Sequence, residues 1–330
     1  MKLSSTPVRT LAAIAIFAAA TLPGSPAAAK DWPERPVRVV VPGTPGATAD
    51  LVARVVAEGM SASLGQPFVV EAKPGGSGAI AVIDMLRSPH DGYTVMIGNS
   101  AIVSEIPHTV KYSFDPAKDI RPLAQLVRGG LVLVGNPAVP ADTLPELLAW
   151  IKSQPGGVSY ASYSPGTLSH IMGLELARSA GVELTHVGYK GSTPGLQDVM
   201  GNQVPLMFDG MITSLPLIKA HKVKAFAVSS PKRSEVLPDV PTFEELGFPN
   251  MTAVGWIGLW TTPDVPESVQ DKLRETALKV LQQPEVRERF RELGQDVGQT
   301  LTVEELESAL ARDYQHVGSV LQAVGHKAPQ

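Results

Sequence analysis

The chain has 330 residues, of which 28 are basic and 32 acidic, and its formal net charge is −4. A balance this close to neutral, without a basic stripe, argues against a nucleic acid as a partner. The chain has no cysteine, which excludes disulfides, thiolate metal sites, a cysteine nucleophile and a lipoprotein anchor. A hydrophobic share of 44% with 18% charged residues is typical of an ordered globular protein.

Residues 1–29 have the pattern of a secretory signal peptide. Lys2 and Arg9 precede an apolar run from Leu11 to Leu22, and the small residues Ala27-Ala28-Ala29 follow it. The apolar run has about a dozen residues, whereas a membrane-spanning helix needs about 20. We therefore expect cleavage after Ala29 and export to the periplasm. The length of the remaining chain predicts two domains.

Short apolar strands alternate with helices in the first part of the exported chain. We predict a strand at 37–41, a helix at 49–64, a strand at 68–71, a helix at 78–86 and a strand at 93–97. Strands that are nearly all apolar and separated by helices favour an α/β fold. We expect mostly parallel sheets, flanked by helices.

Two extended segments, 123–134 and 251–260, enclose a second α/β unit. Within it we predict strands at 158–161, 184–187, 204–208 and 223–228, and helices at 144–153, 166–180, 195–200 and 215–221. Three helices follow at 267–282, 284–293 and 303–324. This order predicts lobe one at residues 30–128 plus 251–330 and lobe two at 129–250. Two crossover strands would join them, and such lobes can close over a ligand by hinge motion.

The clearest candidate for a binding site is the loop from Pro42 to Asp50, between a predicted strand and a long helix. In open α/β sheets, ligands bind beyond the carboxyl ends of the strands, and the start of a helix favours an anion. Gly46 and Ala47 leave room for a ligand, Thr48 either caps the helix or contacts the ligand, and Asp50 is expected to be structural. The loop lacks the P-loop and dinucleotide patterns, so no nucleotide cofactor is expected.

Two further loops also follow a predicted strand. Gly98 to Ala101 offers hydroxyl, amide and N–H groups, although an ordinary capped turn explains it equally well. Ser162 to His170 carries several hydroxyls and opens another helix, and His170 either contacts the ligand or fixes the loop. Two helix N-termini that face each other across a cleft suit a small molecule with two polar ends, such as a dicarboxylate. They require no arginine, because N–H groups and waters can balance the negative charge.

No catalytic or metal centre is predicted. Gly75-Gly76-Ser77-Gly78-Ala79 lacks the last glycine of a nucleophile elbow, and a hydrolase also needs a positioned acid and histidine. An esterase that uses Ser77 is the enzymatic alternative. His170 and Glu175 do not form a His-Glu-x-x-His motif, and no other cluster has ligand spacing. We therefore expect a binding protein without a cofactor.

Several short motifs stand in a fixed order between Trp32 and Val324. They are Pro36-Val37-Arg38-Val39-Val40-Val41-Pro42, Pro45-Gly46 with Asp50, Leu64-Gly65-Gln66-Pro67, Asp91-Gly92-Tyr93-Thr94, Tyr160-Ala161-Ser162, Tyr189-Lys190-Gly191 and Asp239-Val240-Pro241-Thr242. In this order and spacing, the chain resembles the Bug-type periplasmic receptors of tripartite tricarboxylate transporters.

The resemblance implies a two-lobed periplasmic-binding-protein fold of type II and a small mono- or dicarboxylate held between the lobes. It implies a monomer that delivers the ligand to membrane transporter subunits, or alternatively presents it to a sensor kinase. By position, the implied ligand contacts are Thr44, Gly46, Ala47, Thr48, Asn99, Ser100, Ala101, Ser162, Ser164, Gly166, Thr167, His170 and Asp209. Gly43, Ala47, Ser164 and Thr167 differ from the residues usual in the family's loops, so the resemblance leaves the identity of the ligand open.

Overall fold

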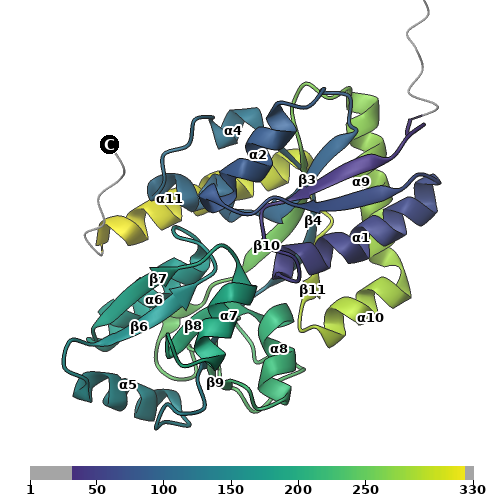
Figure 1. Ribbon diagram of the computed structural model, residues 1–330. Coiled ribbons are helices and arrows are strands. Elements are labelled where there is room, and N and C mark those ends of the chain that lie inside the picture. Colours follow the sequence, from purple (N-terminus) through teal and green to yellow (C-terminus); the bar gives the residue numbers. More distant parts are fainter. Residues whose placement is uncertain (1–31, 324–330) are drawn as a thin grey trace, which may run out of the picture. The chain divides into compact units, whose positions relative to one another are not determined.

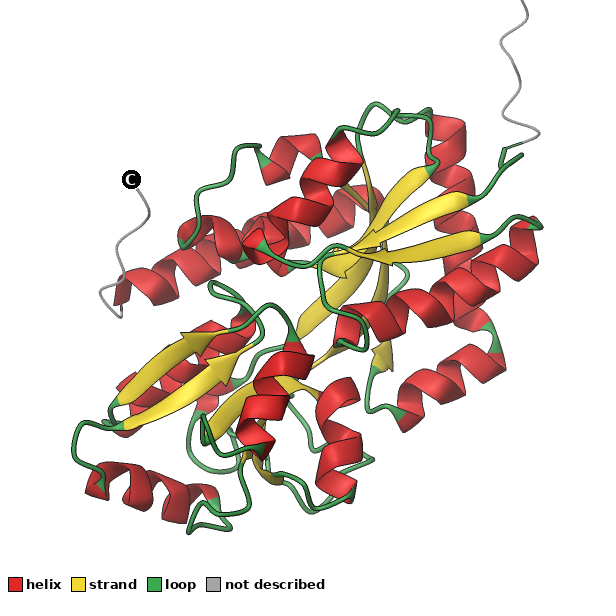
Figure 2. Cartoon of the chain, viewed as in Figure 1, coloured by secondary structure: helices red, strands yellow, loops and turns green. Residues whose placement is uncertain are grey.

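The computed structural model describes residues 32–323, and the predicted signal peptide, residues 1–29, lies outside this range. The described residues form two β-sheets, of six and five strands, with helices on both faces of each sheet (Figure 1, Figure 2). They belong to one compact unit. Within 32–323, no helix has the length and apolar character that a membrane crossing requires. The α/β class expected from the sequence is confirmed.

The six-stranded sheet, sheet I, has the order β11-β4-β10-β3-β1-β2. Its strands are β1 (Val37–Val41), β2 (Phe68–Ala72), β3 (Thr94–Asn99), β4 (Arg121–Gly129), β10 (Gly255–Thr261) and β11 (Asp296–Val297). β1 pairs in parallel with β2 and β3, whereas β10 runs antiparallel to β3 and β4. The carboxyl ends of β1 and β3 therefore open at one edge of the sheet.

The five-stranded sheet, sheet II, has the order β7-β6-β8-β5-β9. Its strands are β5 (Leu131–Gly135), β6 (Val158–Ser162), β7 (Leu184–Gly188), β8 (Leu206–Gly210) and β9 (Lys224–Val228). β6 pairs in parallel with β7 and β8, and β5 runs antiparallel to β8 and β9. Both sheets are thus mixed, whereas the sequence predicts mostly parallel sheets: the pairs around β1 and β6 are parallel, and those around β10 and β5 are antiparallel.

Neighbouring residues of β1 enter different cores, because side chains alternate across a strand. Val39 packs with Val52 and Leu273 on one face of sheet I, and Val40 packs with Val82 and Leu310 on the other. The helices on these faces are α1 (Thr48–Leu64) and α9 (Glu267–Gln282) on the first, and α2 (Ala79–Leu86) and α11 (Val303–Ala323) on the second. Burial on both faces explains the continuous apolar character of this strand.

Sheet II is covered in the same way. Leu133 packs toward α5 (Leu144–Ser153) and α6 (Leu168–Ala180), and Val132 packs toward α7 (Ser192–Met200) and α8 (Met211–Lys219). The expected cap of α5 is present, because Thr143 and Glu146 form a reciprocal capping box. The helix α10 (Pro284–Glu292) and the short helices α3 (Ala101–Ser104) and α4 (Pro116–Asp119) complete the α-helices of the described residues.

The chain passes from sheet I to sheet II between Gly129 and Leu131 and returns between β9 and β10. A Cβ atom on Gly130 would lie 2.5 Å from the backbone nitrogen of Ser230, so the two crossings touch at a position without room for a side chain. We call residues 32–129 and 255–323 half I, and residues 131–253 half II. The predicted lobes, 30–128 plus 251–330 and 129–250, stay a prediction.

Several predicted boundaries were wrong. α8 begins at Met211, directly after β8, and not at residue 215. Pro216 lies inside α8, although proline is usually excluded from the interior of a helix. The residue preferences around Pro216 therefore do not predict a helix that begins at Met211. α6 begins at Leu168 and not at Gly166, because Gly166 has a φ of +81°, outside the helical region. The short helices α3 and α4 carry too few residues to leave a periodic pattern.

Candidate ligand-binding site

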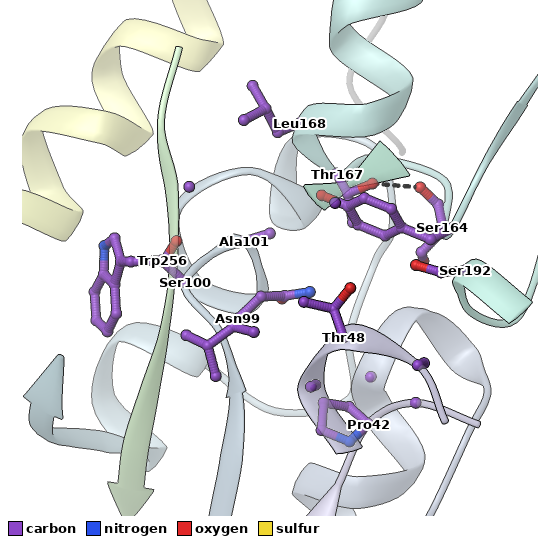
Figure 3. A pocket seen from close by; sticks show the side chains of 18 of the residues that line it. Pro42, Thr48, Asn99, Ser100, Ala101, Ser164, Thr167, Leu168, Ser192 and Trp256 are labelled. Atoms are coloured by element: carbon purple, nitrogen blue, oxygen red, sulfur yellow. Dashed lines mark hydrogen bonds between the residues drawn. The ribbon is translucent and has the colours of Figure 1, made fainter. Parts of the chain in front are cut away.

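A cavity of about 110 Å³ lies between half I and half II. It is lined by segments that follow the carboxyl ends of β1, β3 and β6, and by Gly210 at the end of β8 (Figure 3). This volume holds several water molecules or one small organic molecule. In the described part of the chain, the lining has no arginine, lysine or histidine, and Glu105 is its one carboxylate.

The loop between β1 and α1 presents the start of a helix to this cavity. Asp50, 1% exposed, accepts hydrogen bonds from the Gly46 N–H at 2.9 Å and from Arg54 Nε and Nη2 at 2.9 and 3.0 Å. Asp50 thus has the structural role that the sequence favoured. Ala47, the N-cap residue, supplies no side-chain cap to the first N–H groups of α1. These groups and the helix dipole provide a place for an anion.

The segment after β3 lines the same cavity and is held by β10. The Ser100 N–H donates to the Trp256 carbonyl at 2.9 Å, and Trp260 Nε1 donates to the Gly98 carbonyl at 2.9 Å. Asn99 Oδ1 is buried and has no hydrogen-bond partner among the described residues. A buried acceptor without a donor costs free energy. In Figure 3 the Asn99 side chain extends toward Thr48.

The loop between β6 and α6 contributes Ser164 and Thr167 from half II. Thr167 is the N-cap residue of α6, but its hydroxyl donates to the Ser164 carbonyl at 2.7 Å and not to the helix (Figure 3). The Gly166 N–H donates to His170 Nδ1 at 3.1 Å. The start of α6 therefore reaches the cavity without a cap from its own N-cap side chain.

A pair of histidines packs behind this loop and supports it. Ser162 Oγ lies 2.7 Å from His186 Nε2, and the rings of His170 and His186 stack with centroids 3.9 Å apart. Burial lowers the pKa of His186 to about 4, so its ring is neutral at neutral pH. Ser162 and His170 are not part of the lining. Their contacts are those of residues that fix the loop.

Asp209 lies one layer behind the cavity wall. It is fully buried and accepts hydrogen bonds from Thr213 Oγ1 at 2.5 Å and Ser214 Oγ at 2.8 Å. Burial raises the pKa of Asp209, while hydrogen bonds from Ser192, Thr213 and Ser214 oppose this rise. Ser192 itself lines the cavity. Asp209 therefore acts on the lining through Thr213, whose hydroxyl contacts Thr48 of the cavity.

The structure brings together at the cavity about half of the residues implied by the sequence: Ala47, Thr48, Asn99, Ser100, Ala101, Ser164 and Thr167. It places the others outside the lining: Thr44, Gly46, Ser162, Gly166, His170 and Asp209. Thr44 faces half II, because a Cβ atom on Gly191 would lie 2.8 Å from its Oγ1. The contact set implied by the sequence stays a prediction.

Sequence reasoning missed Glu105, Ser192 and Trp256, which also line the cavity. Glu105 had a signal, because it is the one charged residue between Ala101 and Pro107. It is 7% exposed, and burial raises its pKa to about 8. Ser192 directly follows the Tyr189-Lys190-Gly191 motif, and this position could have indicated Ser192 as a lining residue.

Ser77, the nucleophile of the enzymatic alternative, lines the cavity with a φ of +50°. Its hydroxyl donates to the Pro165 carbonyl at 3.4 Å, and no histidine contact is found for it among the described residues. A serine nucleophile needs an adjacent base. Within 32–323, no group of three or more histidine, aspartate and glutamate side chains gathers as metal ligands would.

Known proteins share both the sequence and the fold of this chain. The profile of the tripartite tricarboxylate transporter family receptors matches residues 52–325. Protein BugT of Bordetella pertussis is 32% identical over 292 residues, which cover 87% of this chain and 88% of BugT. Rpa4515 of R. palustris, solved with adipate, is 29% identical with a TM-score of 0.87, covering 91% of this chain and 100% of that one. MatC of Rhodopseudomonas palustris, solved with bound malate, is 30% identical with a TM-score of 0.82, covering 88% of this chain and 100% of that one.

Proposed function

Since this chain belongs to the receptors of the tripartite tricarboxylate transporter family, we propose that it captures a small organic acid, a mono- or dicarboxylate, in the cavity between half I and half II. It does so in the periplasm, after removal of residues 1–29, and delivers the acid to membrane transporter subunits. One observation carries the proposal. The N-termini of α1 and α6 both reach this cavity, and neither is capped by its own N-cap side chain.

Backbone N–H groups bear the negative charge of the bound acid. Two hydroxyls at the cavity are engaged within the protein, because Thr167 donates to the Ser164 carbonyl and Thr48 Oγ1 lies 3.3 Å from Thr213 Oγ1. The first N–H groups of α1 remain available to the ligand, and they lie at the positive end of the helix dipole. Trp256 and Leu131 supply apolar surface for the hydrocarbon part of the acid. Rpa4515 and MatC, which were solved with adipate and malate, support an organic acid as the ligand class.

The acid is released unchanged. Ser77 is the nucleophile that an esterase would use, and its hydroxyl bonds to a backbone carbonyl and not to a base. The described lining offers no histidine to act as a general base. Receptors of this kind need only bind, close and open.

The test measures binding of a panel of mono- and dicarboxylates by thermal shift and isothermal titration calorimetry. A ligand that binds only the folded chain, at about 100 times its Kd, stabilises the chain by about 2.7 kcal/mol and raises the melting temperature. Absence of any shift with every acid of the panel contradicts the proposal.

A pair of substitutions at Thr48 tests the role of the α1 N-terminus. Thr48 is the first residue of α1, where proline is tolerated because that N–H has no partner within the helix. Thr48→Pro removes the N–H, whereas Thr48→Val keeps it and removes only the hydroxyl. We expect Thr48→Pro to weaken binding about tenfold more than Thr48→Val, the equivalent of about 1.4 kcal/mol. Glu267→Pro, at the first residue of α9, is the control and leaves affinity unchanged. Equal losses of affinity for the two Thr48 variants contradict a role of the Thr48 N–H group in ligand binding.

A further inference from the structure

Glu105 is the one carboxylate among the described residues that line the cavity. It lies between α3 and the 3-10 turn Ile106–His108 of half I. The Glu105 residue is 7% exposed, so its side chain has exchanged nearly all of its water for protein contacts. Such a group is stable only when hydrogen bonds replace that water. Its partners therefore indicate what it does.

The partner of Glu105 comes from the opposite half. The N–H of Leu168, the first residue of α6, donates a hydrogen bond to the Glu105 carboxyl group. The first N–H groups of a helix are the place where an anion is favoured. Glu105 thus occupies the place at the start of α6 that an anion would otherwise take. Its Oε2 atom is buried and has no hydrogen-bond partner within the described part of the chain.

We propose that this oxygen meets the ligand, so that ionised Glu105 selects an organic acid with one carboxylate, held at the start of α1, and a hydrogen-bond donor at its other end, whereas protonated Glu105 also admits a second carboxylate. Amide, hydroxyl and ammonium groups are such donors. The inference rests on the proposed function and narrows its ligand class. Asn99 Oδ1 agrees with it, because it is a second buried acceptor of the same cavity that lacks a donor among the described residues.

A second ligand carboxylate would meet Glu105 at close range. Two carboxylates that share a site with little water do not both stay ionised. The titratable groups that face Glu105 from other elements are Asp313 of α11 and Tyr163 after β6, and neither is a cation. Burial raises the pKa of Glu105 to about 8, against the effect of the Leu168 N–H, and Asp313 adds to the rise. A dicarboxylate therefore binds with Glu105 protonated, and its affinity falls about tenfold for each pH unit above about 8.

The test compares succinate and glutarate with their monoamides, succinamate and glutaramate, by isothermal titration calorimetry on the exported protein. At about pH 9, we expect each monoamide to bind at least about tenfold more tightly than its diacid, because Glu105 is ionised there. At about pH 6, the preference shrinks, because neutral Glu105 tolerates the second carboxylate. Glu105→Gln keeps an acceptor for the Leu168 N–H, is neutral at every pH, and removes the pH dependence. Glu275→Gln, an exposed carboxylate on α9, is the matched control and behaves as the wild type.

Two wild-type results overturn the inference, and both are available even if Glu105→Gln does not fold. One is equal affinity for the diacid and its monoamide at about pH 9, and the other is a diacid affinity that does not fall above about pH 8. Binding of these acids without such discrimination leaves the proposed function standing and removes only the role of Glu105. Absence of binding by every acid at both pH values contradicts the proposed function, and it also contradicts the selection by Glu105.

Discussion

The side-chain oxygens of Thr48 in α1 and Thr213 in α8 lie 3.3 Å apart and join half I to half II. The Thr213 hydroxyl donates to Asp209. A hydroxyl has a single proton, so in this arrangement Thr48 is the donor and Thr213 the acceptor of the contact between the halves. A buried carboxylate in half II thereby fixes the side chain of a cavity residue in half I.

Thr213→Val removes both the donor to Asp209 and the acceptor for Thr48. Because Asp209 is fully buried, the loss of a donor costs about 1–3 kcal/mol of unfolding free energy. We also expect severalfold weaker ligand binding, because Thr48 loses its contact with half II. Thr213→Ser keeps the hydroxyl and retains most of both quantities. Urea unfolding and titration calorimetry measure the two effects, and identical behaviour of the valine and serine variants contradicts the prediction.

Gly210→Ala tests the close approach of the halves without straining the backbone. Gly210 has φ −71° and ψ 145°, which alanine adopts freely. Its Cβ would lie 2.9 Å from Thr48 Oγ1 in the opposite half. We expect about tenfold weaker binding and a loss of unfolding free energy of about 1 kcal/mol, because the buried site has no room for a methyl group. Gly255→Ala is the matched control, because Gly255 also lines the cavity but its Cβ would lie 3.7 Å from Leu168, an ordinary contact. Similar affinities for the two variants show that the approach at Gly210 does not matter.

Strands and helices that bury a regular apolar face were predictable, as β1 and α1 show. The Val37–Val41 run enters cores on both faces of its sheet, and α1 ends at Gly65, which has a φ of +70°. These features depend on neighbours in the sequence. The loop positions after β1, β3 and β6 were predictable for the same reason, because each strand ends just before a helix.

The sequence did not predict which individual side chains line the cavity, as Asp209 shows. β8 continues to Gly210, and side chains alternate along the strand, so Asp209 points away from the cavity. There it accepts hydrogen bonds from the hydroxyls of Thr213 and Ser214. Glu105 and Leu168 are far apart in the sequence, and their contact exists only because the halves meet. No pattern within either segment contains that information. Sequence reasoning found the loops, and the packing of the halves decides which of their side chains line the cavity.

Asp50→Asn tests whether the loop before α1 depends on a buried carboxylate. Asp50 accepts from the Gly46 N–H and from two nitrogen atoms of Arg54, whereas asparagine has one acceptor oxygen. We expect a loss of about 2–3 kcal/mol in unfolding free energy, because hydrogen bonds to charged groups are the stronger ones. Arg54→Lys keeps the positive charge and costs about 1 kcal/mol, since the two-pronged contact is lost on a half-exposed side chain. Chemical unfolding measures both, and an asparagine variant as stable as the wild type contradicts the assignment.

The unfolding free energy of the chain depends on pH through Glu105. Burial raises its folded-state pKa from 4.5 to about 8, so between these values the folded chain holds a proton that the unfolded chain releases. The stabilisation is complete below about pH 4.5 and is lost as the pH rises to about 8, by about 1.4 kcal/mol per pH unit. Glu105→Gln does not titrate, so its stability relative to the wild type should rise across this window and stay constant above it. Asp313→Asn removes a charge that raises this pKa, and should end the window at a lower pH. Urea unfolding at a series of pH values measures these differences, and a constant difference between wild type and Glu105→Gln contradicts a buried, neutral Glu105.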